Sequence, residues 1–256
     1  MRHDDRVSPG SGAGGHLGTV RLRPLTARSA ILSLLLGAHP PSATVSDLVA
    51  FGRQVDINES AVRAALTRMV AAGDLLRDNG TYTLPERLLE RQRRQDEAMQ
   101  VPEEPWDGSW RIAAVVSSGK DAASRVNLRR SMLTAHFAEL REGLWMRPDN
   151  LSWYPSDDIA DDLELMSARP EHDADHLAHH LFQPGRWASV GHTLLAYADR
   201  VSTARDRLTV FATVVRHLTH DPLLPAELLP DDWPGAALRE TYDAFRDEVI
   251  REWRRS

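Results

Sequence analysis

The sequence predicts an α+β protein with an N-terminal winged helix-turn-helix, a ferredoxin-like middle domain and a helical C-terminal domain. Three observations lead to this fold. Three short helical patterns precede an Asn-Gly hairpin within residues 21–85, a β-α-β-β-like alternation follows Pro105, and long helical patterns fill the remainder. Of the 256 residues, 42% are hydrophobic and 27% are charged, which is an ordinary composition for a globular protein.

The N-terminal residues 1–20 are polar and rich in glycine, which predicts a disordered tail. No apolar run approaches the roughly 20 residues that span a bilayer, and nothing near Met1 resembles an export signal. The chain contains no cysteine, which excludes disulfides, thiolate catalysis and cysteine-bound zinc. We therefore expect a cytoplasmic protein that makes no membrane contact.

Charge is unevenly distributed along the chain. Residues 21–100 carry a net charge of +2, whereas residues 101–256 carry −8. A mildly basic N-terminal part and an acidic C-terminal part suit a protein that contacts nucleic acid with one end only.

Helix signals define the first domain, residues 21–85. Thr26 can cap the first helix by accepting a backbone N–H, and Gly37 can end it. A second helix is expected from near Thr44 to Gly52. A third is expected over residues 59–72, capped by Asn58 or Asp56.

A hairpin follows the third helix. Asn79-Gly80 is a strong two-residue turn signal, because both positions of a type I′ turn need positive φ. The predicted apolar face of this hairpin consists of Leu76, Tyr82 and Leu84.

The third helix divides into two faces. Helical spacing turns one set of residues inward, namely Val62, Ala65, Leu66, Met69 and Val70. The opposite side carries hydrogen-bond donors, as a recognition helix requires. With the hairpin, where a wing can reach the DNA backbone or minor groove, the predicted DNA-binding residues are Ser60, Arg63, Thr67, Arg68, Arg77 and Asn79.

Three further segments follow. Residues 86–104 are predicted to be a linker with an exposed helix whose arginines can lie along phosphates. Residues 105–170 contain strand patterns at 110–116, 143–148 and 163–166 around an amphipathic helix at 122–135 with apolar Val126, Leu128, Met132 and Leu133, which suggests a ferredoxin-like domain. Residues 171–256 are mostly helical and include a proline-rich strap, residues 221–235.

Four stretches together resemble the PaaX-type repressors of phenylacetate catabolism. They are the opening helix (25–37), the third helix and its exit (58–75), PWDGSWRI with EGLWMRP (105–112 and 142–148), and the strap (221–235). The strap is the most specific because it is long, proline-rich and otherwise unusual.

The resemblance implies a homodimeric repressor that binds a palindromic double-stranded DNA operator. It also implies release from DNA by a small-molecule effector, an aryl-acyl-CoA, and it assigns recognition-helix roles to Ser60, Arg63, Thr67 and Arg68. The segments 136–142 and 149–186 match the family poorly, so the effector can differ. No cofactor and no enzymatic activity are implied.

Aromatic and histidine residues offer further candidates. Trp145 and Trp187 border the least family-like segments, and either can stack on an aromatic effector. His172, His176 and His180 recur at helical spacing, where such residues can bind a divalent metal, but a polar, solvated helix in an acidic region is the favoured interpretation, and no metal site is predicted.

Two alternatives to the regulator remain open. A metal-dependent nuclease is one, since ferredoxin-like domains occur in nucleases. The sequence also has an acidic cluster, but the composition of this cluster favours a solvated loop over a site of paired carboxylates (Asp157, Asp158, Asp161 and Asp162). The other is a protein–protein adaptor that uses the winged helix for contacts, which a lack of salt-dependent DNA binding would favour.

Overall fold

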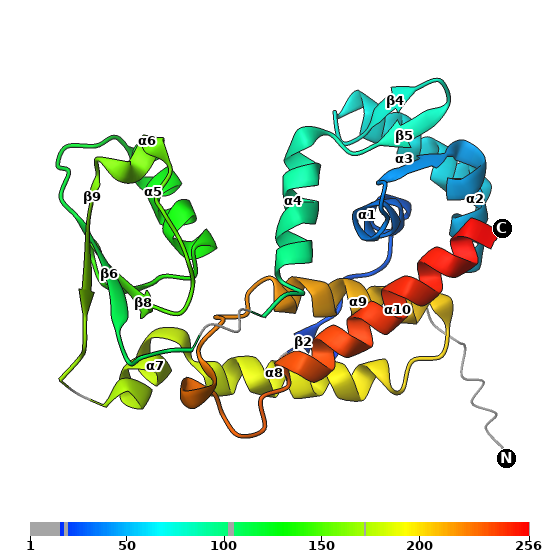
Figure 1. Ribbon diagram of the computed structural model, residues 1–256. Coiled ribbons are helices and arrows are strands. Elements are labelled where there is room, and N and C mark those ends of the chain that lie inside the picture. Colours follow the sequence, from blue (N-terminus) through cyan, green and yellow to red (C-terminus); the bar gives the residue numbers. More distant parts are fainter. Residues whose placement is uncertain (1–15, 18–19, 102–104, 172, 256) are drawn as a thin grey trace, which may run out of the picture. The chain divides into compact units, whose positions relative to one another are not determined.

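The computed structural model describes residues 16–17, 20–101, 105–171 and 173–255. Most of the predicted tail, residues 1–20, lies outside this part. At the described end of this segment, strand β1 (His16–Leu17) pairs with β2 (Val20–Arg21). Helices dominate and the strands form small antiparallel sheets, which confirms the α+β class (Figure 1).

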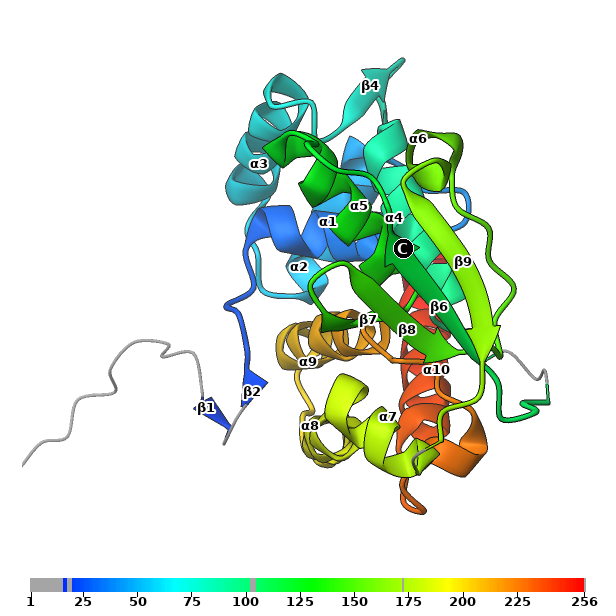
Figure 2. The ribbon, with the colours of Figure 1, turned by 90° about the vertical axis from the view of Figure 1, so that its left-hand side faces the viewer.

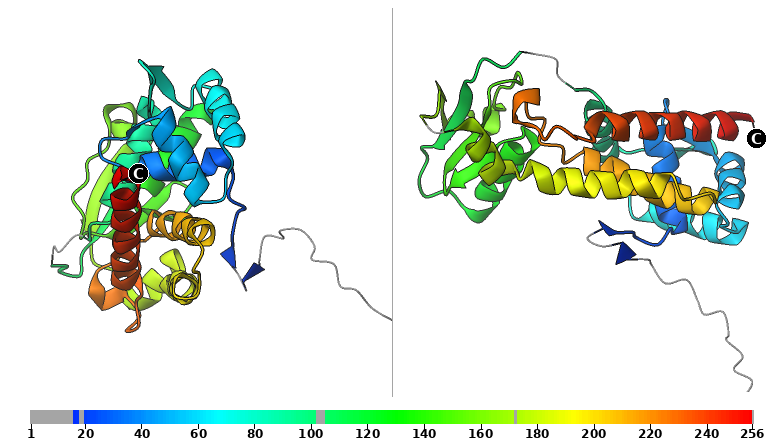
Figure 3. Two further views of the ribbon diagram at one scale, coloured as in Figure 1. Left: turned by 90° about the vertical axis from the view of Figure 1, so that its right-hand side faces the viewer. Right: turned by 90° about the horizontal axis from the view of Figure 1, so that it is seen from below.

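The described chain forms two compact units that interleave in sequence. The first unit holds residues up to Gln92, Thr193–Val215 and the residues from Thr241 on, while the second holds Arg93–His192 and Arg216–Glu240. Four helices contribute residues to both units: α4 (Glu86–Glu97), α8 (Pro184–Ala198), α9 (Ala204–Leu218) and α10 (Gly235–Arg255). Figure 3 shows α10 as a long unbroken helix.

Three helices open the first unit, as predicted: α1 (Ala27–Gly37), α2 (Val45–Gln54) and α3 (Glu59–Ala71). Their N-caps are Thr26, Thr44 and Asn58, and each side chain accepts the backbone N–H three residues later. Helix α2 runs two residues beyond the predicted end at Gly52.

The Asn-Gly hairpin is confirmed. Strands β4 (Leu76–Asp78) and β5 (Thr81–Thr83) pair across Asn79 and Gly80, whose φ angles are 46° and 83°. Strand β3 (Ser42–Thr44), which was not predicted, pairs with β5 and gives the sheet order β3-β5-β4. Leu76 was wrongly assigned to the buried face: it is 54% exposed, because the preceding Leu75 fills that core position at 1% exposure.

The contact between α2 and α3 depends on a small residue at Gly52. A Cβ there would lie 2.6 Å from Val62 Cγ2 and 3.2 Å from the Ile57 carbonyl oxygen. Gly52→Ala is therefore expected to lower the free energy of unfolding by about 1–3 kcal/mol through overpacking. Urea unfolding measures this change. Gly185→Ala is the matched control, since nothing lies within 4 Å of its Cβ position, and equal midpoints for both variants would contradict the expectation.

The second unit contains a four-stranded antiparallel sheet (Figure 2). Its elements follow in the order β6 (Trp110–Val115), α5 (Ala122–Thr134), β7 (Ala138–Arg141), β8 (Leu144–Pro148), α6 (Asp157–Ala160) and β9 (Leu163–Ala168). The strand order is β7-β8-β6-β9 and every neighbouring pair is antiparallel. This is the β-α-β-β-α-β arrangement of a ferredoxin-like domain. Strand β7 and the short helix α6 were not predicted.

Both faces of this sheet are covered, since alternate side chains of each strand point to opposite sides. Ala113 and Trp145 pack with Leu128 and Met132 of α5 on one face. On the other face, Trp110 and Met146 pack against helix α7 (Ala174–Phe182) and the strap, which contains the 3-10 turn η1 (Ala226–Leu228).

Two predictions about which side chains are buried and which are exposed fail, one on helix α5 and one on helix α4. Val126 and Leu133 of α5 are 57% and 53% exposed, because one narrow stripe of this helix, with Leu128 and Met132, covers the sheet. Helix α4 is not exposed throughout, since Leu88, Gln92 and Gln95 are buried. The Gln92 amide donates to the carbonyls of Leu35, Leu36 and Ala38 at the end of α1, where helix carbonyls run short of backbone N–H partners.

No helix among the described residues is long and apolar enough to cross a membrane.

Candidate nucleic-acid interface

Helix α3 has the two faces that the sequence predicted. Val62, Ala65, Leu66 and Met69 are at most 2% exposed, and Val70 is half-buried. Ser60, Arg63, Thr67 and Arg68 are all exposed on the other side. The helix thus has an apolar back fixed in the core and a polar front open to solvent.

An acidic side chain at the start of α3 restrains Arg63. Glu59 Oε1 accepts a hydrogen bond from Arg63 Nε at 2.8 Å, and Glu59 Oε2 accepts one from an Arg53 Nη at 2.9 Å. The hydrogen bond from Arg63 lowers the pKa of Glu59 most, and the one from Arg53 lowers it further. Glu59 therefore stays ionised and occupies part of the donor capacity of Arg63.

Thr67 and Arg68 differ in how many of their hydrogen-bond donors remain available to an external acceptor. The Thr67 hydroxyl donates to the Arg63 carbonyl at 3.1 Å, so its hydrogen is directed to the helix backbone. Arg68 is exposed and makes no ion pair with any carboxylate that the structure describes. Its five N–H donors are therefore available to an external acceptor.

The hairpin presents Arg77 from the middle of β4 and Asn79 from its turn. The Arg77 guanidinium lies 5.8 Å from the centre of the Tyr82 ring on the neighbouring strand, which directs this side chain along the hairpin. Asn79 is exposed and adopts the positive φ that the turn requires. Both residues accordingly remain accessible from solvent.

Asp74, just after α3, anchors the exit of this helix. Its carboxylate pairs with Arg28 of α1 at 2.9 Å and with Arg87 of α4, and the Asp74 side chain is 14% exposed. Burial alone would raise the pKa of Asp74, but the hydrogen bonds from Arg28 and Arg87 outweigh it and lower that pKa. The three helices around the hairpin are thereby tied together.

Arg205 of α9, far away in the sequence, hydrogen-bonds to the backbone beside helices α1, α2 and α3. Its guanidinium donates to the Leu25 carbonyl at 3.1 Å and to the carbonyls of Val55 and Asp56 at 3.4 and 3.5 Å. These carbonyls lie just before α1 and in the turn between α2 and α3, where Asp56 has a positive φ of 57°. Sequence analysis missed this residue, because nothing in a helical pattern 149 residues away signals the contact.

Both tryptophans proposed to contact an effector are buried. Trp145 is 2% exposed in the core beneath α5, with the Arg129 guanidinium 5.3 Å from its ring. Trp187 is 8% exposed and stacks with His217 at 4.1 Å and Trp233 at 4.3 Å. Two nearly parallel rings at these distances must occupy opposite faces, so an effector would have to displace one of them to stack on Trp187.

Comparison with known families decides the identity. The PaaX-like protein family matches residues 26–88, the PaaX protein central Cas2-like domain matches 103–178, and the PaaX-like C-terminal domain matches 195–255. The chain belongs to the PaaX-like family.

One solved structure is similar to this chain over most of its length. It is that of an uncharacterized protein from Mycobacterium tuberculosis, 47% identical, with a TM-score of 0.77 and a match that covers 89% of this chain and 97% of that one. No protein with curated annotation matches the chain.

The remaining histidine and aspartate candidates are dispersed in this PaaX-like protein. His172 lies outside the described residues, while His176 and His180 are exposed on α7. Among the described residues, no three histidine or carboxylate side chains are placed to share a metal ion. The acidic cluster is not simply a solvated loop, since Asp157 and Asp158 begin α6 and the Asp162 side chain, 8% exposed, pairs with Lys120 at 2.8 Å.

Proposed function

We propose that this PaaX-like protein is a DNA-binding transcriptional regulator and that helices α1–α3 with the sheet β3-β5-β4 are a winged helix-turn-helix. The observation that carries the proposal is the exposed front of α3, where Arg63, Arg68 and Ser60 face solvent on the side opposite its buried apolar residues. A helix of this kind can enter the major groove and donate to base edges and phosphates. The family is one of transcriptional regulators, which supports the same conclusion.

The hairpin would act as the wing. Arg77 and Asn79 project from it, where they can contact the backbone or the minor groove beside α3. Asp74 and Arg205 are the positioning residues, because they join the ends of α3 to α1, α4 and α9. The DNA-binding domain is then residues 21–85, followed by a linker over 86–104, the ferredoxin-like domain at 105–170 and the C-terminal domain at 171–256.

We further propose a cytoplasmic homodimeric repressor. Two recognition helices must reach half-sites about 34–36 Å apart, or a multiple of that, so two copies are required for a palindromic operator. Family resemblance supports an aryl-acyl-CoA effector that releases the protein from DNA. Trp145 and Trp187 remain the aromatic candidates near that effector.

The proposal is tested by a salt series of binding to DNA from the region upstream of the protein's own gene, with scrambled DNA as control. Neutralising phosphates makes the logarithm of the binding constant fall linearly with the logarithm of the salt concentration. We expect tighter binding to the upstream DNA and its release by phenylacetyl-CoA. Specific binding without release would remove the thioester as effector, and no binding at any salt would overturn the regulator.

Glu59 provides a second prediction. Glu59→Gln removes a negative charge near the phosphates and frees Arg63, so binding to scrambled DNA is expected to strengthen several-fold at low salt. Fluorescence anisotropy with labelled DNA measures the change. Glu227→Gln, at an exposed position of η1, is the matched control and should bind as the wild type does. A weaker Glu59→Gln complex would instead assign Glu59 to orienting Arg63.

A further inference from the structure

Two arginines oppose each other on the sheet of the ferredoxin-like domain. Arg111 of β6 and Arg147 of β8 are direct cross-strand partners, on the α5-covered face that also holds Ala113 and Trp145. Like charges directly opposite each other destabilise a sheet. One carboxylate lies beside them: Asp149 Oδ1 accepts a hydrogen bond from Arg111 Nε at 3.2 Å.

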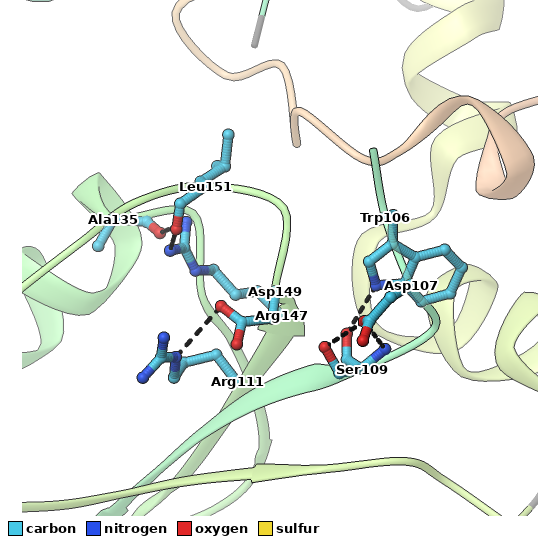
Figure 4. A network of polar contacts seen from close by, with 8 residues as sticks. All are labelled: Trp106, Asp107, Ser109, Arg111, Ala135, Arg147, Asp149 and Leu151. Atoms are coloured by element: carbon cyan, nitrogen blue, oxygen red, sulfur yellow. Dashed lines mark hydrogen bonds and ion pairs between the residues drawn. The ribbon is translucent and has the colours of Figure 1, made fainter. Parts of the chain in front are cut away.

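Arg147 has no share in that ion pair. Figure 4 shows its guanidinium turned toward Ala135 and Leu151 and away from Arg111. It donates to the Ala135 carbonyl at 3.3 Å and to the Leu151 carbonyl. The residue is 3% exposed and forms no ion pair with a described carboxylate, while its Nε is buried without any hydrogen-bond partner.

The guanidinium nevertheless remains charged. Burial lowers the pKa of Arg147 to about 10, which still leaves it protonated near neutral pH. A buried cation without a counter-ion costs free energy, and proteins usually pair it with a carboxylate. Two cations and one anion at this end of the sheet thus leave one positive charge uncompensated.

We propose that Arg147 is the anion-binding residue of a small-molecule site on this face and that its ligand is an organic carboxylate. The unpartnered Nε and the Nη beside it form the fork that a planar carboxylate fits with two parallel hydrogen bonds. The ligand's negative charge balances the second arginine.

The surroundings define the rest of the ligand. The Phe137 ring lies 5.0 Å from the Arg147 guanidinium, and Trp153 meets Phe137 edge-on at 5.1 Å. Trp145, two residues from Arg147 on the same strand, lies in the same core. This apolar wall favours a carboxylate with an aromatic or aliphatic body over phosphate, because a doubly charged anion loses more hydration on burial.

The Arg111–Asp149 pair lies where a ligand would reach Arg147 from solvent. These side chains are 35% and 19% exposed, so solvent reaches the residue next to Arg147. Asp149 is then a competitor of the ligand for the two arginines. This site is distinct from that of the proposed aryl-acyl-CoA effector, because a thioester has no free carboxylate. The binding of the anion therefore does not depend on the proposed function, and it is measured without DNA.

The test uses the full chain at constant ionic strength with benzoate, acetate or inorganic phosphate as probe. Benzoate is expected to raise the melting temperature by about 3–6 °C at roughly ten times its Kd, with acetate weaker. Arg147→Met should abolish the shift relative to its own unliganded melting temperature. Arg147→Lys, which retains the charge without the fork, should bind at least ten-fold more weakly by calorimetry.

Two further variants make the outcome decisive. Arg169→Met removes an exposed arginine paired with Asp107 and should leave benzoate binding unchanged. Asp149→Asn should bind benzoate more tightly, because the competing carboxylate is gone. The assignment is overturned if no probe shifts the melting temperature, or if Arg147→Met and Arg147→Lys both respond as the wild type does. A response to phosphate alone would overturn the carboxylate class.

Discussion

Replacing both Arg63 and Arg68 with alanine is expected to abolish specific operator binding while leaving the fold intact. Each guanidinium that contacts a base edge contributes about 1–3 kcal/mol, so the double variant should bind at least about 30-fold more weakly. Both side chains are exposed on α3 and neither packs in the core. The melting temperature should therefore stay close to that of the wild type.

The two single variants separate the roles. Arg68 makes no described ion pair, whereas Arg63 must leave Glu59 to reach DNA, so Arg68→Ala should have the larger effect. Anisotropy titrations at two salt concentrations measure it, with Arg200→Ala as control, since that residue is exposed in the turn after α8. Operator affinity unchanged in the double variant would remove α3 from the interface.

Breaking the buried ion pair of the strap should be the largest single loss of stability. Arg239 and Asp221 pair at 2.7 Å with side chains 7% and 4% exposed. Arg239→Met leaves the Asp221 carboxylate buried and unpaired, which costs about 3–5 kcal/mol. It also removes the donor to the Ala98 carbonyl, at 2.9 Å. Chemical denaturation of the full chain measures the loss.

A double variant tests the cause of this loss. Adding Asp221→Asn to Arg239→Met removes the stranded charge, and Asn can still accept the Leu223 N–H that Asp221 accepts at 2.9 Å. The double variant should therefore be more stable than Arg239→Met alone. Additive losses would mean that side-chain packing, and not the unpaired carboxylate, accounts for the effect.

Local sequence signals predicted much of the fold. Thr26, Asn58 and the Asn79-Gly80 turn act within a few residues of themselves, so helix starts and the hairpin followed from them. Strand β3 was missed because three residues between two helices carry no periodicity, and its pairing with β5 exists only in three dimensions. Leu76 was misplaced because the apolar pair Leu75-Leu76 leaves the register undecided.

The candidate sites show the same limit. The division of α3 into two faces is a property of one helix, and the sequence predicted it. The Arg205 brace and the Arg111–Arg147 opposition join residues that are 149 and 36 positions apart, and only folding brings them together. Trp187 likewise gave no sign of its stack with His217 and Trp233.

The most direct test of the central claim, that α3 reads the major groove, is methylation interference at guanine N7 across the upstream DNA. N7 lies in the major groove, and its methylation blocks an arginine donor. We expect interference at two half-sites whose centres are about 10–10.5 base pairs apart or a multiple of that, and its loss at specific guanines with Arg68→Ala. Binding that tolerates N7 methylation at every position would contradict the account.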